Sequence, residues 1–413
     1  MAESGISELS VRQHGAMEFS EAPVNLDVVR CYRYGRIQAE LQRRDLAGIV
    51  LFDQLNTRYA TDATNMQIWC SHNETRYVWV PAVGDATIFD YGEDGIHAAG
   101  LPNIAETRPS QAFFYYAAGP NIGRTAKKWA SEILDLVRGS GGDNRRIAMD
   151  RVSPLGTQAL EAVGLEIFDG FEVMELARRI KSPEEIVLMQ AAIDVCEDAI
   201  GLMKDALEPG ITENALFAKL AGRNFELGGE WMECRLLASG PRTNPWMHES
   251  SMRVVNDGDI LAFDTDMIGP YGYCADISRT WVCGGNKGTD VQRRLYGAAL
   301  SQIDFNMNLF KPGASFREIS ELAWKIPDAF LKGRYSVIAH GIGLCDEYPG
   351  IKHDVDYASI GYDGLIEEGM TFCVESYIGA EGGHEGVKLE EQILITKDGY
   401  RRLSRYPFDD ALM

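Results

Sequence analysis

The fold of this chain is decided by Asp259-Ile-Leu-Ala-Phe-Asp-Thr-Asp-Met-Ile-Gly-Pro-Tyr-Gly-Tyr-Cys-Ala-Asp276, which predicts a β-hairpin. The run from Ile260 to Met267 is apolar and favours a strand, and Gly269 to Gly272 has the glycine and proline residues typical of a turn. The chain then returns along a second strand, from Tyr273 to Val282. Aspartates within an apolar hairpin are unusual, so they direct the rest of the interpretation.

Three aspartates of this hairpin are predicted to converge on one surface. A turn centred on Pro270 places Asp264 directly across from Asp276, with Cβ atoms about 5 Å apart. Asp266 falls on the same face as Asp264, because side chains in a strand repeat every second residue. Such a cluster repels itself and raises its own pKa values unless a cation is bound. The hairpin alone fits either a metal site or a solvated acidic face on an edge hairpin.

Three further residues extend this set of possible metal ligands. His340 lies in an apolar, glycine-flanked segment, and Glu375 and Glu390 each interrupt an otherwise apolar strand. Taken singly, such a histidine is also typical of a hydrogen-bonded core residue, and such a glutamate of the wet face of a strand. Together, five or six carboxylates and one imidazole suit two divalent cations that are bridged by shared carboxylates.

Composition restricts the class of protein. The chain has 413 residues, 45% of them hydrophobic, which allows two or three domains with a large core. Its net charge of −21 argues against nucleic acid and anionic membrane surfaces as partners. No apolar run reaches the ~20 residues of a membrane helix, and residues 1–20 lack the pattern of a secretory signal. Eight scattered cysteines without a CxxC pair favour a reduced, cytoplasmic compartment.

Two domains are expected. Strands alternate with helices over the first 175 residues or so, which predicts a small α/β domain. A helix start follows at Lys181-Ser-Pro-Glu-Glu-Ile186, where Ser182 is the expected N-cap and Glu185 completes a capping box. We therefore expect one domain over residues 1–178 and a second over residues 179–413.

The order and spacing of five residues resemble the metal ligands of the creatinase/aminopeptidase P/methionine aminopeptidase superfamily, also called M24 or pita-bread: Asp264, Asp276, His340, Glu375 and Glu390. The resemblance covers the whole chain. It implies an α/β fold in which a creatinase-type N-terminal domain precedes a pita-bread metalloenzyme domain. It also implies a homodimer and two divalent metal ions per chain, with iron expected and manganese, nickel, cobalt or zinc as alternatives. Asp266 stands where the superfamily typically has glycine and is a candidate sixth ligand.

Departures from the superfamily's peptidases point to another reaction. Those peptidases usually carry a histidine seven positions after the metal-binding histidine, and here that position is Glu347, preceded by the unusual acid Asp346. The motifs FDTD, AHGIGLCDEYP and SGPRTNPW are similar to those of the dimethylsulfoniopropionate (DMSP) lyases of the superfamily. This resemblance implies a carbon–sulfur lyase that releases dimethyl sulfide and acrylate. The alternatives are an Xaa-Pro dipeptidase of the same fold and a catalytically inactive binding module, although the latter usually loses several ligands.

Release of dimethyl sulfide and acrylate from DMSP is a β-elimination. The chemical requirements of this reaction assign roles to further residues. A base must take the proton next to the substrate carboxylate, and Asp346, six residues past His340, is the candidate; otherwise it is a turn aspartate. The sulfonium needs a pocket that accepts a cation, which aromatic faces provide. The candidate substrate-binding residues, each of which is also typical of simple packing or loop structure, are Tyr335, Trp246, Tyr348 and His248.

Overall fold

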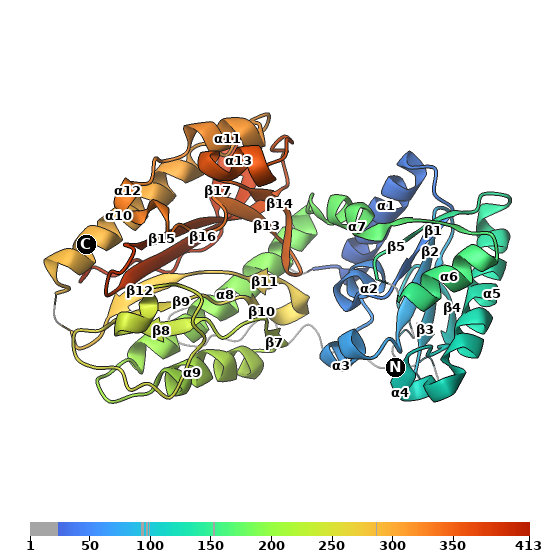
Figure 1. Cartoon of the computed structure of the whole chain (residues 1–413), viewed down its shortest axis with the longest axis horizontal. Helices are drawn as coiled ribbons and strands as arrows, with labels where there is room; N and C mark the ends of the chain where they lie inside the picture. The colour runs from blue at the N-terminus through green and yellow to red at the C-terminus, as the bar shows by residue number, and fades with distance from the viewer. Residues whose placement is uncertain (1–23, 92–94, 96–97, 99, 152, 286) are drawn as a thin grey trace. The chain divides into compact units, whose positions relative to one another are not determined.

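The computed structural model describes residues 24–91, 95, 98, 100–151, 153–285 and 287–413 (Figure 1). It contains two compact units, one of residues 25–178 and one that contains residues 179–413. Residues 1–20, where we expect no secretory signal, lie outside the described residues. Within the described ranges, no helix combines the length and apolar character needed to cross a membrane.

The unit of residues 25–178 is a six-stranded mixed sheet in the order β4-β3-β2-β1-β5-β6. Its strands are β1 (Gly48–Leu51), β2 (Tyr77–Pro81), β3 (Ala86–Asp90), β4 (Ile104–Pro109), β5 (Arg146–Met149) and β6 (Glu166–Asp169). Its α-helices are α1 (Leu26–Arg43), α2 (Gln54–Thr61), α3 (Gln67–His72), α4 (Tyr115–Ala118), α5 (Ile122–Gly141), α6 (Pro154–Ala162) and α7 (Gly170–Arg178).

Helices cover both faces of this sheet, because its central strand is apolar at every position. All four residues of β1 are buried. Successive side chains in a strand point to opposite faces of the sheet. Val50 lies on the face covered by α5, since it shares a core cluster with Trp129 of that helix. Figure 1 shows α5 and α6 on this side of the sheet and α1 and α7 on the other. The alternation of strands and helices confirms the predicted α/β class for this part of the chain.

The unit that contains residues 179–413 is built from three antiparallel sheets, in the orders β11-β10-β7, β12-β9-β8 and β14-β13-β15-β16-β17. The strands of the two small sheets are β7 (Trp231–Met232), β8 (Leu237–Ser239), β9 (Ile260–Phe263), β10 (Met267–Ile268), β11 (Cys274–Ala275) and β12 (Arg279–Val282). The large sheet consists of β13 (Ala339–Ile342), β14 (Asp346–Ile351), β15 (Thr371–Gly379), β16 (Gly386–Thr396) and β17 (Gly399–Arg402). The helices are α8 (Pro183–Asp205), α9 (Glu213–Glu226), α10 (Asp290–Met307), α11 (Phe316–Leu322), α12 (Asp328–Leu331) and α13 (Asp354–Ile360).

Helix α10 packs on β15 and β16 (Figure 1). Buried apolar residues of all three elements belong to one hydrophobic cluster. At the start of the unit, the predicted capping box is present. The Ser182 hydroxyl accepts the N–H of Glu185, and the Glu185 carboxylate accepts the N–H of Ser182. Two of the otherwise unpaired donors at the start of α8 are thereby satisfied.

The aspartate hairpin is present, but the predicted register is wrong: each cross-strand partner is shifted by two residues. Phe263 pairs with Arg279 and Met267 pairs with Ala275, so continuation of this pairing sets Asp266, not Asp264, across from Asp276. The shift arises at the turn, where Tyr271 adopts a left-handed backbone with φ of 62°. The hairpin therefore turns one residue later than a turn centred on Pro270, and every partner moves by two residues.

Candidate metal centre

The hairpin brings its three aspartates together at the point where its ladder is interrupted. One carboxylate oxygen from each of Asp264, Asp266 and Asp276 lies within 4.8 Å of the others. The backbone of Asp266 has a φ of 35°, and its N–H donates to Asp276 Oδ1 at 3.3 Å. A left-handed conformation at a residue other than glycine costs on the order of 1–3 kcal/mol and is concentrated at functional sites.

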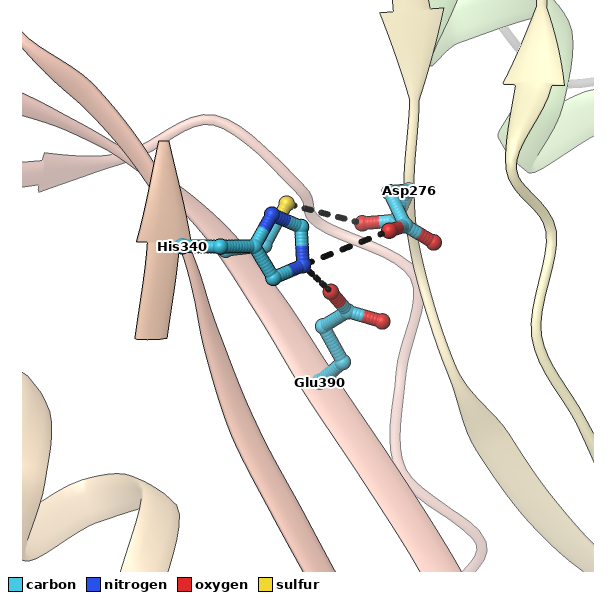
Figure 2. A group of neighbouring side chains, drawn as sticks. Asp276, His340 and Glu390 are labelled. Atoms are coloured by element: carbon cyan, nitrogen blue, oxygen red, sulfur yellow. Dashed lines mark hydrogen bonds and ion pairs between the residues drawn. The ribbon is translucent and has the colours of Figure 1, made fainter. Parts of the chain in front are cut away.

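The large sheet supplies the other ligand candidates. Glu375 on β15 pairs directly with Glu390 on β16, and His340 lies on the neighbouring strand β13. His340 Nε2 is 3.3 Å from Glu375 Oε1 and 3.6 Å from Glu390 Oε1. The same nitrogen is 3.7 Å from Asp276 Oδ2, so the imidazole lies between the two sheets (Figure 2). The thiol of Cys373 joins this group, with its Sγ 3.7 Å from the Asp276 carbonyl oxygen.

The electrostatics of the cluster fit divalent cations. Burial raises the pKa of Asp276 well above its usual value, and the negative charges of Asp266 and Glu390 raise it further. Burial also raises the pKa of Glu375 to about 8, with Glu390 adding to the shift. Among the described residues, Glu390 Oε1 is buried and has no hydrogen-bond partner. Hard and borderline divalent metals prefer oxygen ligands, and a bound metal would relieve the repulsion between these buried carboxylates.

One buried cation already lies among these carboxylates, and it was missed in the sequence. The ammonium of Lys388, with no exposed side-chain surface, is 2.7 Å from Glu375 Oε2 and 3.0 Å from Asp264 Oδ2. It is also 3.2 Å from Glu390 Oε2 and donates to Ser278 Oγ at 2.6 Å. The signal was present in the spacing, because Lys388 is two residues from Glu390 and so shares its face of β16.

Asp346 lies at the accessible edge of the cluster, at the start of β14. Its Oδ1 is 3.4 Å from His340 Nδ1, on the side of the imidazole away from the buried carboxylates, and 57% of its side chain is exposed. Partial burial raises the pKa of Asp346 to about 6; the charge of His340 opposes this shift, while Asp266 and Glu390 add to it. A carboxylate with this pKa is ionised at neutral pH and is a stronger base than an ordinary aspartate.

Two of the predicted substrate-binding residues, Tyr335 and Trp246, belong to one apolar group, and Tyr335 lies beside the cluster. Trp246 is in an apolar group with Ala262 and Tyr377, against which Tyr335 also packs. The Trp246 and Tyr377 rings stack with centroids 6.0 Å apart, and the Lys388 ammonium lies 4.7 Å from the Tyr335 centroid. Tyr377 was not singled out in the sequence, although its position two residues after Glu375 places it on the same face of β15.

The other two predicted substrate-binding residues have structural contacts. The Tyr348 ring stacks on Tyr362, with centroids 5.7 Å apart, and also packs against Phe316. His248 Nδ1 lies 2.9 Å and 3.0 Å from the carbonyl oxygens of Arg242 and Pro245, within its own loop. The Tyr348 ring therefore has a packing role, and the His248 imidazole holds its own loop together. A substrate role for either one stays a prediction.

Comparison with known proteins agrees with this architecture. The sequence profile of metallopeptidase family M24 matches residues 187–397. The Xaa-Pro dipeptidase from Bacillus anthracis superposes with a TM-score of 0.71 and covers 92% of this chain and 98% of that one, at 21% sequence identity. These findings confirm the predicted pita-bread fold with an N-terminal domain.

Two curated relatives match nearly the whole chain. Dimethylsulfoniopropionate lyase DddP of Roseovarius nubinhibens is 40% identical over 394 residues, which cover 94% of this chain and 88% of that protein. The DddP lyase of Roseobacter denitrificans is 42% identical over 395 residues, with the same coverage of both chains. The chain belongs to metallopeptidase family M24, in the group that contains the DddP lyases.

Proposed function

We propose that this chain is a metal-dependent carbon–sulfur lyase that cleaves DMSP to dimethyl sulfide and acrylate. The observation that carries the proposal is Asp346, an accessible carboxylate 3.4 Å from the imidazole of a buried carboxylate and histidine cluster. Such a group suits proton abstraction from a small carboxylic acid held at the cluster. The 40–42% identity to two DMSP lyases supports the same reaction. In this proposal residues 1–178 form the N-terminal domain and residues 179–413 the catalytic domain.

Six residues are proposed to hold two divalent transition-metal ions, with iron as the first choice and manganese, nickel, cobalt or zinc as alternatives: Asp264, Asp266, Asp276, His340, Glu375 and Glu390. Their carboxylates, buried except for the partly buried Asp266, and their single imidazole suit such ions. A bound divalent metal supplies a Lewis acid that stabilises the negative charge developing on the substrate carboxylate.

The proposed chemistry of the protein residues is a single proton abstraction. The carboxylate of Asp346 takes the proton from the carbon next to the substrate carboxylate. The electron pair of that C–H bond forms the double bond of acrylate. The carbon–sulfur bond breaks with its pair on sulfur, and neutral dimethyl sulfide leaves. Asp346 then returns its proton to water, which the exposure of its side chain permits.

The sulfonium end of DMSP is proposed to contact the aromatic group beside the cluster. A cation over an aromatic face gains about 0.5–2 kcal/mol, more when desolvated. Trp246 is the main candidate in this role, because the ring of Tyr335 already has the Lys388 ammonium beside it.

The direct test is incubation of the purified, metal-loaded protein with DMSP. Gas chromatography of the headspace should detect dimethyl sulfide, and chromatography of the solution should detect acrylate in equal amount. An Xaa-Pro dipeptide offered under the same conditions tests the alternative reaction of the family. Hydrolysis of the dipeptide without release of dimethyl sulfide would replace the proposal with a peptidase.

The homodimer implied by the family resemblance stays a proposal. Light scattering of the purified protein tests it, because a single chain has a mass of 45.8 kDa. A mass of twice this value is expected, and a mass of one chain at micromolar concentration would contradict it.

A further inference from the structure

The turn between β13 and β14 leads into Asp346, whose Oδ1 lies 3.4 Å from His340 Nδ1. Its register is interrupted between His340 and Gly341, after which Ile342 pairs with Asp346. The Asp346 side chain is 57% exposed, so burial of its own side chain does not fix its position. Proton abstraction nevertheless requires a carboxylate held to within a fraction of an ångström. The residues that hold this turn therefore bear on the proposed reaction.

Glu347, the next residue, points in the opposite direction and is enclosed. Neighbouring side chains in a strand point to opposite faces, so fixing Glu347 inward turns Asp346 toward His340. The Glu347 carboxylate lies 2.7 Å from the ammonium of Lys181, and the side chains are only 1% and 3% exposed. Glu347 Oε1 also accepts the N–H of Leu344 at 3.2 Å. The carboxylate fills the space beside Gly343, where a Cβ would come within 2.4 Å of it.

Both ends of this ion pair are anchored to other parts of the unit. Lys181 directly precedes Ser182, the N-cap of α8, and its N–H donates to the Gly369 carbonyl at 2.9 Å. On the other side of the turn, the Gly343 carbonyl accepts the N–H of Cys274 at 2.8 Å. The turn is thus connected to the start of α8 and to the hairpin that carries the aspartates.

We infer that Lys181 and Glu347 are a positioning pair that holds the Asp346 carboxylate beside His340. A buried ion pair is a weak source of stability, because desolvation cancels most of the attraction between its charges. The main effect of this ion pair is on geometry and not on stability, because it fixes Glu347, the residue next to the proposed base. This inference rests on the proposed lyase function and adds two positioning residues to the proposed metal ligands and substrate contacts.

The test compares DMSP turnover of Lys181→Met and Glu347→Gln with the parent enzyme, each loaded with metal. Both substitutions remove one charge and nearly retain the side-chain length. We expect kcat to fall about 10–100-fold, with KM within about threefold, because substrate binding does not involve the pair. Metal content and the unfolding temperature of the metal-loaded protein are measured for each variant. Lys204→Met, which removes the 3.0 Å ion pair with Asp409 elsewhere in the unit, is the matched control.

A second arm separates positioning from a structural role. In the Asp346→Ala background, Glu347→Gln should lower the residual turnover by less than about threefold, because its effect acts through the missing carboxylate. Lys181→Arg keeps the charge and should retain more turnover than Lys181→Met. If Glu347→Gln fails to fold, Glu347→Asp, which keeps the charge one methylene shorter, takes its place in both comparisons, with the same fall in kcat expected.

Three results would overturn the inference. These are kcat within threefold of the parent in both single variants, loss of activity in proportion to lost metal, and a full further loss in the Asp346→Ala background. Failure of the proposed function is distinguishable, because the parent enzyme itself would then release no dimethyl sulfide.

Discussion

Replacing Lys388 with methionine should destabilise the metal-free protein far more than the metal-loaded protein. The Lys388 ammonium is fully buried and within 3.2 Å of oxygens of Asp264, Glu375 and Glu390. Methionine nearly matches the length of the lysine side chain but carries no charge. In the metal-free variant, three buried carboxylates therefore lose the cation that they share.

The expected size follows from this geometry. Removing one partner of a buried ion pair costs about 3–5 kcal/mol, because the remaining charge is left without compensation. For a unit of about 235 residues, one kcal/mol corresponds to roughly 2–4 °C in unfolding temperature. The metal-free Lys388→Met protein should thus unfold about 6–20 °C below the parent. With divalent ions bound to the same carboxylates, the loss should be less than about half of this.

Differential scanning calorimetry after chelation and after reconstitution measures both losses. The control is Lys325→Met, because Lys325 is a lysine of the same unit whose side chain is 67% exposed and 3.3 Å from Asp354. It should shift unfolding by no more than about 2 °C in either form. Equal losses for the metal-free and metal-loaded forms of Lys388→Met would refute the reasoning, since the lysine would then stabilise the fold independently of the cluster.

Three further outcomes are expected. Asp346→Asn should lower release of dimethyl sulfide about 10²–10⁴-fold with metal content unchanged, and a loss below tenfold would assign the base to another group. Glu390→Gln should reduce metal by at least one ion per chain in elemental analysis, and full occupancy would contradict its role as a ligand. Burial, with a contribution from the charge of Arg334, lowers the pKa of His353 from 6.5 to about 4. The unfolded chain therefore binds this proton between pH 6.5 and 4 while the folded chain does not, so about 3 kcal/mol of stability is present above pH 6.5 and lost as the pH falls toward 4. In urea unfolding at pH 7 and pH 4.5, His353→Asn should lose correspondingly less stability than the parent, and an equal loss would exclude this assignment.

The candidate ligands Glu375 and Glu390 could be identified from the sequence, because a charged residue stands out in a strand that is otherwise apolar. Glu375 and Glu390 were found as charged residues in apolar strands, and the structure pairs them directly. The register of the hairpin could not be obtained in the same way. It depends on whether Tyr271 adopts a left-handed conformation, which is uncommon for a residue other than glycine. A strand pattern fixes which face a side chain is on, but the turn decides its partner.

The buried lysines were missed for a different reason. Lysine is almost never fully buried unless it is paired, so a lysine in a strand is usually assigned to solvent. Both lysines are instead enclosed: Lys181 faces Glu347, far away in the chain, and Lys388 faces the distant Asp264 as well as Glu375 and Glu390 of its own hairpin. For Lys388 the spacing from Glu390 was the one local signal, whereas no local pattern around Lys181 indicates that it pairs with Glu347.

The charge of the cluster favours two metal ions over one. Its five proposed carboxylate ligands, buried except for the partly buried Asp266, and the Lys388 ammonium leave four negative charges when the acids are ionised. One divalent ion would leave two of these charges uncompensated in a largely buried site, at a cost of several kcal/mol per fully buried charge. Two divalent ions neutralise the cluster and leave Asp346, at its exposed edge, as the carboxylate free to accept a proton. Without Lys388 the metal-free cluster would carry a fifth charge, which is why we expect that substitution to be felt chiefly when the metal has been removed.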